Sequence, residues 1–440
     1  MIHLDPQQSA ALDVLNAGQS CFLTGSAGTG KSTVTTAFIA SSMKRVDVAA
    51  TTGIAALNLR DQFSARSGGR PVTVSTIYRW LGIGLGPQDG QSPGDFYNWW
   101  RGQWSKSKMA AARRIESAEC LVIDEISMLP GRLLTYLDFH CRQILHRPEP
   151  FGGLQIVPVG DFLQLPPVDK TGKGYDWAFR SPAWQGIRPV MLEKIHRQAD
   201  PEFASLLNEF RVGRLSTAGV ASMQKRVAPF CSALIPRLFT HNRDVDHWNA
   251  AMLGNLPDEP VTYMARISGD REDQRNWLIK NLVTPHILTI KKGARVMVTA
   301  NLAEPGGELL ASNGTLAVVQ IAGRDKVQIK TDDGLTLELA PHMWQFDQQD
   351  DESAKFYQIP LRLAWASTIH KSQGLTLKEA WLDIRAAREP GQAYVGLSRV
   401  KSIAGLHLKA VPAGIFTAPA AVAFYGSIRA GATPPPVHNH

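Results

Sequence analysis

The sequence has little cysteine, and what it has is spaced too widely for a metal site or a disulfide framework. Among its 440 residues there are four cysteines, Cys21, Cys120, Cys141 and Cys231. No two of them have the C-x-x-C spacing typical of structural zinc sites. Cys21 and Cys120 adjoin apolar stretches, where a free thiol usually packs as a small buried side chain. We therefore expect neither bound zinc nor disulfides.

Long apolar runs and targeting signals are also missing. No apolar run reaches the roughly 20 residues that a membrane-spanning helix needs. Residues 1–6 lack the charged-then-apolar pattern of a signal peptide. Hydrophobic residues make up 44% of the chain and charged residues 20%, which is an ordinary globular composition with enough apolar mass for more than one core. The formal net charge of +8 fits a polyanionic partner, and it fits a generically basic protein equally well.

A glycine-rich stretch at residues 25–33 matches the phosphate-binding pattern G-x-x-x-x-G-K-[ST] at every defined position. It follows an apolar run at residues 21–23 and precedes a helix-like segment at residues 34–40, which is the strand–loop–helix context that the pattern needs. Glycines let backbone N–H groups surround an anion, and the start of a helix adds its positive dipole end. The nucleotide-binding residues predicted here are Gly25, Ser26, Ala27, Gly28, Thr29, Gly30, Lys31, Ser32 and Thr33.

This pattern predicts a nucleoside triphosphate with Mg²⁺, because Lys31 can reach the β- and γ-phosphates while the Ser32 hydroxyl can ligate the metal. Two adjacent carboxylates, Asp124 and Glu125, end another apolar strand. Ligands of a parallel sheet bind at the carboxyl ends of its strands. Asp124 is therefore placed to hold Mg²⁺, and Glu125 to orient or deprotonate an attacking water.

Three further polar residues are candidates for the same chemistry. Gln164 follows a third apolar strand, where its amide could sense the γ-phosphate. Arg197 and Arg399 lie in the second half of the chain, and an arginine that meets the γ-phosphoryl group stabilises phosphoryl transfer. Taken singly, however, each arginine could equally be a surface or packing residue.

Alternating helices and short apolar strands predict an α/β fold with parallel sheets in two halves, at residues 1–190 and 191–412. Glycines and prolines interrupt the first half at about residues 82–108, which we interpret as an insertion. Short strands separated by Asn-Gly and Asp-Gly turn signals predict a small β-barrel-like insertion at about residues 300–355. Residues 413–440 are rich in Ala and Pro, and we expect them to form a loosely ordered tail.

Taken together and in this order, the motifs resemble those of the Pif-type (petite integration frequency) DNA helicases, in the 5′-to-3′ branch of superfamily one. The resemblance runs from about residue 4 to residue 408. The segments that carry it are residues 4–8, 25–33, 51–56, 124–128, 160–167, 196–198, 368–374 and 391–399, and residues 150–155 look like the end of the family's signature element.

The resemblance implies two RecA-like P-loop domains, with ATP bound between them and an SH3-like barrel inserted in the second. It implies that Gln8 contacts adenine and that Gln373 and Gly374 lie near the nucleotide. Arg197 and Arg399 would both come from the second domain. The implied catalytic residues are Lys31, Glu125, Gln164, Arg197 and Arg399, and the implied metal ligands are Ser32 and Asp124.

Single strands of DNA are held by electrostatic contacts to phosphate and by stacking of bases on aromatic side chains. Tyr78 stands where the family commonly has His, and Trp80 beside it could equally belong to the core. The cluster of Trp99, Trp100 and Trp104 with nearby basic residues is either a wedge that splits duplex DNA or the packing of the insertion, and one tryptophan could pack while another stacks. The DNA-binding residues predicted are Thr51, Thr52, Gly53, Thr76, Tyr78, Trp99, Trp100, Thr368, His370, Lys371 and Ser372.

The sequence therefore predicts an ATP- and Mg²⁺-dependent helicase that translocates 5′ to 3′ on single-stranded DNA and unwinds duplex or structured DNA. The polarity rests on the resemblance alone. We expect a monomeric motor on single-stranded DNA and single/double-strand junctions, cytoplasmic and associated with the nucleoid or replication fork, with no membrane partner. Two alternatives remain open: a translocase that displaces proteins from DNA, and a non-catalytic module that binds single-stranded DNA, against which the intact ATP motifs argue.

Overall fold

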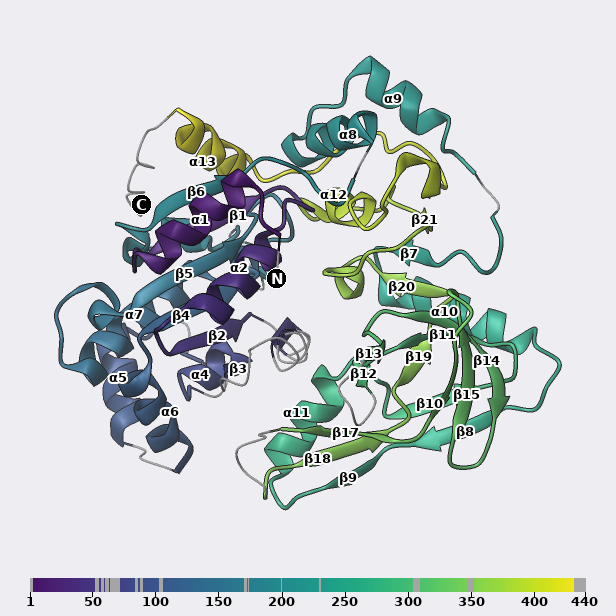
Figure 1. The fold of residues 1–440 in the computed structure, drawn as a ribbon, viewed down its shortest axis with the longest axis horizontal. Coiled ribbons are helices and arrows are strands. Elements are labelled where there is room, and N and C mark those ends of the chain that lie inside the picture. Colours follow the sequence, from purple (N-terminus) through teal and green to yellow (C-terminus); the bar gives the residue numbers. More distant parts are fainter. Residues whose placement is uncertain are drawn as a thin grey trace. The chain divides into compact units, whose positions relative to one another are not determined.

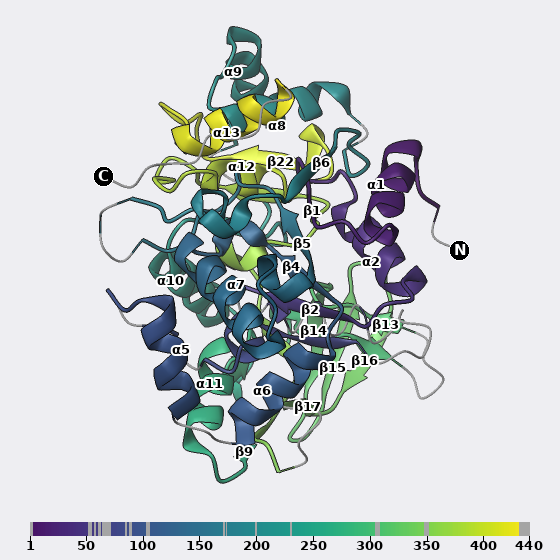
Figure 2. The same cartoon turned by 90° about the vertical axis from the view of Figure 1, so that its left-hand side faces the viewer.

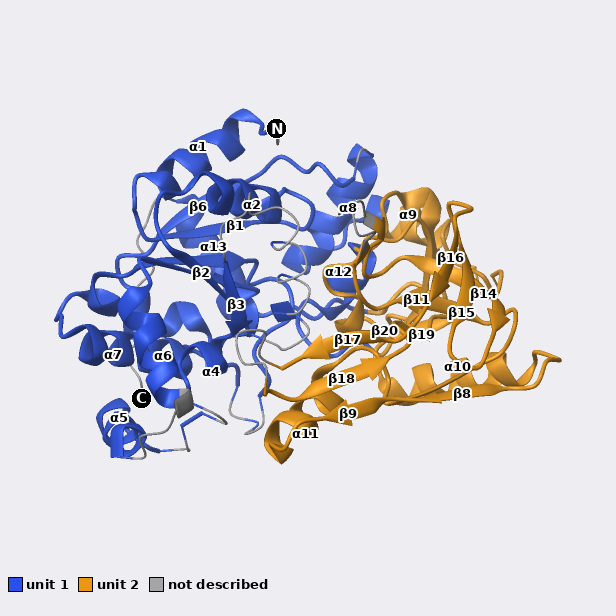
Figure 3. Ribbon diagram, turned by 60° about the horizontal axis from the view of Figure 1, so that its bottom comes forward, with its two compact units in different colours: residues 1–219, 387–398, 414–440 blue, residues 220–386, 399–413 orange. Residues whose placement is uncertain are grey.

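The chain is divided into two compact units. The computed structural model describes residues 3–430 except for 52–54, 57–58, 60–62, 64–71, 84–85, 88–89, 103–105, 170–171, 173, 199, 229–230, 304–308 and 347–351. Unit 1 comprises Met1–Gly219, Ala387–Ser398 and Gly414–His440, and unit 2 comprises Val220–Ala386 and Arg399–Ala413 (Figure 3). The expected border near residue 190 therefore lies later in the chain. Residues 387–398, which we assigned to the second half, and residues 414–440, which we assigned to the tail, belong to unit 1.

Unit 1 is built on a six-stranded sheet with the order β3-β2-β4-β5-β1-β6, in which each neighbouring pair is parallel (Figure 1). Every residue of β1, β2 and β5 is buried, as expected for central strands covered on both faces. The predicted parallel α/β fold is confirmed. The strands are β1 (Cys21–Gly25), β2 (Val46–Ala50), β3 (Thr73–Thr76), β4 (Cys120–Asp124), β5 (Gln155–Gly160) and β6 (Arg188–Leu192).

Helices cover both faces of this sheet, and successive strand residues point to opposite sides (Figure 2). In β4, Val122 belongs to the core beneath α1 and α2, whereas Leu121 and Ile123 belong to the core beneath α7. The helices of unit 1 are α1 (Pro6–Asn16), α2 (Lys31–Ser41), α4 (Ile77–Trp80), α5 (Pro93–Gly102), α6 (Lys106–Ser117), α7 (Gly131–Leu145), α8 (Pro201–Val212), α12 (Gln392–Leu397) and α13 (Pro419–Arg429), with short 3₁₀ turns η1 (Ile126–Met128), η2 (Pro150–Gly153), η3 (Ala178–Arg180) and η4 (Pro182–Trp184).

The expectation of a loosely ordered tail is wrong for residues 419–429, which form the helix α13. Its Ala421, Phe424 and Tyr425 are buried in the core of unit 1. Phe424 stacks on Phe179 with 4.4 Å between ring centroids and contacts Phe162 edge-on. The i, i+3, i+4 spacing of these residues is the amphipathic signal of a packed helix, and the Ala- and Pro-rich composition concealed it. Residues 431–440 lie outside the described part of the chain.

Unit 2 contains a four-stranded parallel sheet with the order β20-β7-β21-β22. Its strands are β7 (Arg237–Phe239), β20 (Ala366–Thr368), β21 (Ala380–Leu382) and β22 (Leu406–Leu408), accompanied by α9 (Thr217–Gln224) at the border of the units, α10 (Asn242–Gly254), η5 (His370–Ser372) and η6 (Ile403–Gly405). The guanidinium of Arg237 lies over the rings of Trp248 and Trp381, 4.0 and 4.4 Å from their centroids.

Between β7 and β20, unit 2 contains antiparallel strands around a separate apolar core. The largest sheet there has the order β16-β15-β14-β11-β19, and Gly334 turns the chain between β15 and β16 with φ of 91°, where Asp-Gly predicted a turn. The antiparallel region starts at β8, earlier than expected. Its elements are β8 (Val261–Met264), β9 (Arg266–Ser268), α11 (Glu272–Asn281), β10 (Ile287–Ile290), β11 (Arg295–Val298), β12 (Leu302–Ala303), β13 (Leu309–Ala311), β14 (Leu316–Ala322), β15 (Val327–Thr331), β16 (Thr336–Leu339), β17 (His342–Gln345), β18 (Lys355–Gln358) and β19 (Leu361–Leu363).

Among the described helices, none has the length and apolar character needed to cross a bilayer.

The packing of α13 predicts a large loss of stability for Phe424→Ala. Phe424 is 5% exposed and lies among aromatic rings. Removing a buried phenyl ring leaves a cavity, so we expect the free energy of unfolding of unit 1 to fall by about 3–5 kcal/mol in urea denaturation. Phe416→Ala is the matched control: Phe416 is 42% exposed, and we expect a change below about 1 kcal/mol. Equal losses for the two variants would contradict the packing of α13.

Candidate nucleotide-binding and DNA-binding sites

The phosphate loop between β1 and α2 has backbone conformations that glycine adopts most easily. Gly28 and Gly30 both have φ of 85°, in the left-handed region. A Cβ on Gly28 would lie 2.6 Å from the Cβ of Arg197, so another chain segment passes close to the loop here. Gly30 is the N-cap of α2 and makes no side-chain cap, so the first N–H groups of the helix stay available to an anion.

Lys31 is folded onto its own loop. Its Nζ donates hydrogen bonds to the carbonyl oxygens of Gly25 (2.8 Å) and Ser26 (3.0 Å). Burial lowers the pKa of Lys31, and the strongest opposing charge is the carboxylate of Asp161, followed by that of Glu125. Ser32, next to Lys31, is exposed. The ammonium group of Lys31 is thus held inside the loop, and Ser32 lies exposed at the start of α2.

Asp124 and Glu125 lie where β4 ends. An Asp124 carboxylate oxygen accepts a hydrogen bond from the Glu125 N–H at 2.9 Å. Burial and, secondarily, the charge of Glu125 raise the pKa of Asp124 to about 7, despite the opposing charge of Lys31. Glu125 has φ of 51° and ψ of 45°, an unusual conformation for a residue with a side chain. Strained backbone of this kind is concentrated at functional sites.

These residues fit a magnesium ion bound together with a nucleotide. Within the described ranges, no three His, Cys, Asp or Glu side chains gather into a metal site. Mg²⁺ normally uses one or two protein oxygens together with phosphate oxygens and waters. A dication near Asp124 would also favour the ionised carboxylate that burial disfavours. The oxygens of Ser32 and Asp124 are of the kind that such a site needs, and their role as its ligands stays a prediction.

A buried ion pair supports the loop that carries Gln164. Arg211 of α8 donates two hydrogen bonds of 2.9 Å to the carboxylate of Asp161, and both side chains are nearly inaccessible to solvent. Burial by itself would raise the pKa of Asp161, but the charge and hydrogen bonds of Arg211 outweigh it and lower the pKa. The carbonyl of Asp161 accepts from the Gln164 N–H at 2.9 Å, so the ion pair sits at the base of this loop.

Arg197 belongs to unit 1, which corrects the expectation that it comes from the second domain. After β6 the chain runs along the phosphate loop: the His196 N–H donates to the carbonyl of Gly28 at 2.8 Å, and the Arg197 N–H donates to it at 3.3 Å. The Arg197 guanidinium donates to the carbonyl of Ser398 at 3.3 Å. Burial lowers its pKa, although the charge of Glu125 opposes this.

Gln8 is buried and serves two structural contacts. Its amide oxygen accepts from the Asp5 N–H at 3.1 Å, completing a capping box at the start of α1. Its amide nitrogen donates to the carbonyl of Thr29 at 3.2 Å. Gln8 therefore adjoins the phosphate loop, and its contact with adenine stays a prediction.

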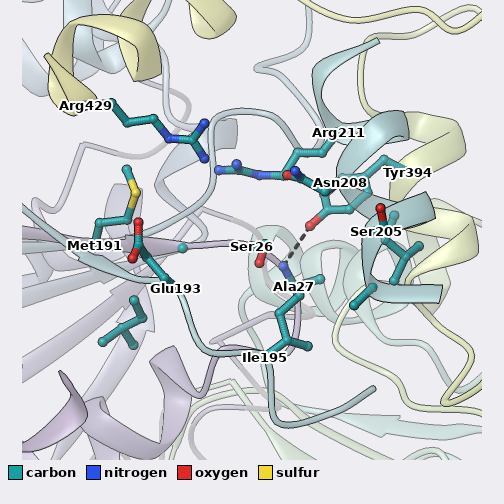
Figure 4. Close-up of a pocket in the computed structure, with 14 residues that line it drawn as sticks. Ser26, Ala27, Met191, Glu193, Ile195, Ser205, Asn208, Arg211, Tyr394 and Arg429 are labelled. Atoms are coloured by element: carbon teal, nitrogen blue, oxygen red, sulfur yellow. Dashed lines mark hydrogen bonds between the residues drawn. The ribbon is translucent and has the colours of Figure 1, made fainter. Parts of the chain in front are cut away.

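A pocket of about 260 Å³ adjoins the beginning of the phosphate loop (Figure 4). Gly25, Ser26 and Ala27 line one side, and α8 lines another. The Tyr394 hydroxyl accepts a hydrogen bond of 2.7 Å from the Ala27 N–H. Figure 4 shows the guanidinium groups of Arg211 and Arg429 pointing toward each other.

In unit 2, the expected DNA contacts have different exposures. His370 and Lys371 are exposed, whereas Thr368 and Ser372 are buried. The Ser372 hydroxyl is buried and donates to the carbonyl of Ile369 at 2.7 Å, so it stabilises the turn η5. The Thr368 hydroxyl accepts from the Lys371 N–H at 3.2 Å and holds the exposed pair in place.

The other residues predicted in unit 2 adjoin the same turn. Gln373 is partly buried, and Gly374 is exposed with φ of 81°. Arg399 is 2% exposed, and its guanidinium donates to the carbonyl of Leu375 at 3.3 Å. Their roles toward a nucleotide stay predictions.

In unit 1, Trp99 and Trp100 behave differently. Trp100 is fully buried and donates from its indole nitrogen to the carbonyl of Gly82 at 2.9 Å, so it packs the insertion instead of meeting DNA. Trp99 is 46% exposed, and the ammonium of Lys108 lies 4.6 Å from its ring centroid. Trp80 is also fully buried and donates to Asp47. Trp104 lies outside the described residues.

The remaining first-half candidates are only partly described. Thr51 is half-buried, and Thr52 and Gly53 lie outside the described residues. The Thr76 hydroxyl accepts from the Arg79 N–H at 3.3 Å as the N-cap of α4. Tyr78 is half-buried, and desolvation raises the pKa of its phenol.

Comparisons with known proteins agree with this architecture. The family described as an AAA domain matches residues 3–228. The ATP-dependent DNA helicase Pif1 of Bdellovibrio bacteriovorus is 32% identical over 438 residues, which cover 96% of this chain and 92% of that protein. The chain belongs to the Pif1 helicase family.

Other Pif1 proteins are similar over nearly the whole chain. ATP-dependent DNA helicase PIF1 of Homo sapiens is 33% identical over 97% of this chain but only 64% of its own length. Bacteroides sp. Pif1 in complex with ADP-AlF4 has a TM-score of 0.79 at 28% identity, covering 98% of each chain. Bacteroides Pif1 bound to ssDNA has a TM-score of 0.66 at 27% identity, again covering 98% of each chain.

For this Pif1-family chain, sequence reasoning missed Tyr394, Asp161 and Arg211. Tyr394 and Asp161 lie inside segments that carried the resemblance. The sequence therefore pointed to these segments, but it did not show which residues the two side chains contact. Arg211 lies on a helix with an ordinary amphipathic pattern and had no signal of its own. Only the fold brings its guanidinium to Asp161.

The raised pKa of Asp124 predicts that Asp124→Asn stabilises the metal-free protein at alkaline pH. Because this pKa is higher in the folded than in the unfolded chain, folding binds a proton and stability falls as pH rises from about 4 to about 7. At pH 8 in EDTA, we expect the variant to have a higher melting temperature than wild type. The difference should be about 2–4 °C for each kcal/mol of stability that the substitution restores. At pH 4 the difference should vanish. Asp13→Asn, at an exposed position on α1, is the control, and the same offset at both pH values would contradict the pKa shift.

Proposed function

We propose that this chain hydrolyses ATP to translocate 5′ to 3′ on single-stranded DNA and to unwind duplex DNA. The observation that carries the proposal is the gathering of the phosphate loop, the Asp124–Glu125 pair, the Gln164 loop and Arg197 in one unit. Bacteroides Pif1, which is similar in fold over almost the whole chain, has been solved with ADP-AlF4 and with ssDNA. The polarity rests on family resemblance.

The side chains divide the chemistry between them. Lys31 would leave its loop carbonyls and donate to phosphate, while Ser32 and Asp124 would hold Mg²⁺, which supplies charge neutralisation at the phosphates. Glu125 would orient the attacking water, and Gln164 would contact the γ-phosphoryl group. Arg197 would stabilise the charge that develops there, and we assign the same role to Arg399.

DNA binding would use exposed groups of both units. His370 and Lys371 stand exposed on η5, inside one of the segments that carry the family resemblance. Thr51 and Tyr78 would contribute from unit 1. Trp99 is 46% exposed, with Phe96 stacked on its ring and the Lys108 ammonium over it, so a base that stacks on Trp99 would displace Lys108 toward a phosphate. We expect the motor to act as a monomer on single-stranded DNA and on junctions.

Duplexes with a single-stranded tail on one end test the proposal directly. We expect unwinding of a 5′-tailed duplex that requires ATP and Mg²⁺, and little unwinding of a 3′-tailed duplex of the same sequence. Lys31→Ala should lower ATP turnover by at least about 100-fold and leave ssDNA affinity nearly unchanged, because it removes a phosphate contact and no DNA contact. Unwinding from the 3′ tail would overturn the polarity. ATP turnover with displacement of a DNA-bound protein but no strand separation would indicate a translocase.

The exposure of Trp99 predicts a selective loss of unwinding. We expect Trp99→Ala to lower the unwinding rate several-fold and to leave ssDNA-stimulated ATP hydrolysis within about twofold, since base stacking contributes about 1–3 kcal/mol per base. Trp99→Phe keeps an aromatic face and should restore most of the unwinding. Trp100→Ala should instead lower the melting temperature, because Trp100 is core. An equal loss of both activities in Trp99→Ala would reject a wedge role.

A further inference from the structure

The hydroxyl group of Tyr425, on the C-terminal helix α13, joins two loops of the nucleotide site. It lies 2.6 Å from the hydroxyl of Thr24, the residue before the first glycine of the phosphate loop. It also accepts a hydrogen bond of 3.2 Å from the N–H of Phe162, two residues before Gln164. Thr24 and Phe162 are fully buried, and Tyr425 is 4% exposed, so no solvent competes for these contacts.

The ring of Tyr425 covers the ion pair that shapes the Gln164 loop. The Arg211 guanidinium lies 4.6 Å from the ring centroid. Arg211 in turn donates hydrogen bonds to the carboxylate of Asp161. This carboxylate also accepts from the Leu163 N–H at 3.1 Å, and the Asp161 carbonyl accepts from the Gln164 N–H. Arg211 also lines the pocket that Ser26 and Ala27 line (Figure 4).

The position of the Tyr425 hydroxyl is fixed by its neighbour. Phe424 is packed on Phe179 and contacts Phe22, Phe162 and Trp184, which belong to the core beneath the sheet. Tyr425 cannot move without disturbing this packing, because close-packed interiors resist shifts of a single side chain. Its hydroxyl therefore acts as a rigid spacer between the ends of β1 and β5.

We propose that α13 is part of the ATPase site and that Tyr425 is a positioning residue, which holds the phosphate loop and the Gln164 loop at their working separation. The inference deepens the proposed function and rests on it. It is consistent with the electrostatics, because Asp161 is also the charge that most supports the protonated form of Lys31. A loss of this arrangement would misplace Gln164 relative to Lys31 without removing either side chain.

Tyr425→Phe tests the proposal with the smallest change, since it keeps the ring and its contact with Arg211. We expect kcat for ssDNA-stimulated ATP hydrolysis to fall at least about tenfold, because small misplacements of reacting groups have large effects on rate. The KM for ATP and the affinity for ssDNA should change less than about threefold, since no group that contacts either ligand is removed. Tyr263→Phe is the matched control: Tyr263 is 8% exposed, and its hydroxyl donates to the carbonyl of Gly323 in unit 2.

A double-mutant cycle separates positioning from general stability. Thr24→Val removes the partner hydroxyl and should reproduce much of the fall in kcat. The double variant should lose little more than Tyr425→Phe alone, because both substitutions break the contact between Thr24 and Tyr425, while Tyr425→Phe also removes the acceptor of the Phe162 N–H. Thr24→Ser retains the hydroxyl and should recover most of the activity. Assays are made well below the melting temperature of each variant, so that a loss of folded protein is not read as a loss of rate.

The outcomes are distinct. Wild-type kcat in Tyr425→Phe, with or without a lower melting temperature, would overturn the positioning role and leave the proposed ATPase intact. Additive losses in the double variant would also overturn it. Wild-type protein without any ssDNA-stimulated ATP hydrolysis would instead refute the proposed function.

Discussion

The nucleotide site depends on one constraint, the parallel pairing of β1, β4 and β5. Parallel neighbours end at the same edge of a sheet, so the loops that follow them emerge together. Thr24 pairs in register with Gly160, and Ala50 pairs with Asp124. The phosphate loop, the carboxylate pair and the Gln164 loop are therefore neighbours in space although about 140 residues separate the first from the last. A shift of one residue in any of these pairs would move a functional side chain to the other face.

The same edge of the sheet concentrates charge in a region with little water. Lys31, Asp124, Glu125, Asp161 and Arg211 interact electrostatically within unit 1. Burial by itself favours the neutral forms of Lys31, Asp124 and Asp161. The ion pair with Arg211 keeps the carboxylate of Asp161 ionised. At Asp124, burial and then the charge of Glu125 outweigh the opposing charge of Lys31, and the pKa is raised. A site of this kind is prepared for a ligand that brings both phosphate and a dication.

The site also explains why the border between the units is not a single point in the sequence. Residues of α8 and α12 belong with the phosphate loop because Arg211 bonds Asp161 and Tyr394 bonds the Ala27 N–H. The chain passes from Ser398 to Arg399 as it leaves unit 1, directly after the helix that holds Tyr394. Hydrogen bonding and ion pairing across distant segments, rather than continuity of the chain, decide which residues belong together.

Much of the candidate site could be read from the sequence, because phosphate binding is a local property of the backbone. Glycine spacing, a lysine at the helix start and carboxylates after an apolar strand specify the loop and the side chains that we predict to bind the metal, all within a few residues of chain. The parallel α/β class and the antiparallel insertion followed from strand patterns and turn signals for the same local reason. Trp100, Arg211 and Tyr425 could not be assigned in this way. Whether a tryptophan is buried or an arginine meets a carboxylate is decided by which distant residues the fold packs around it, and only the tertiary structure holds that information.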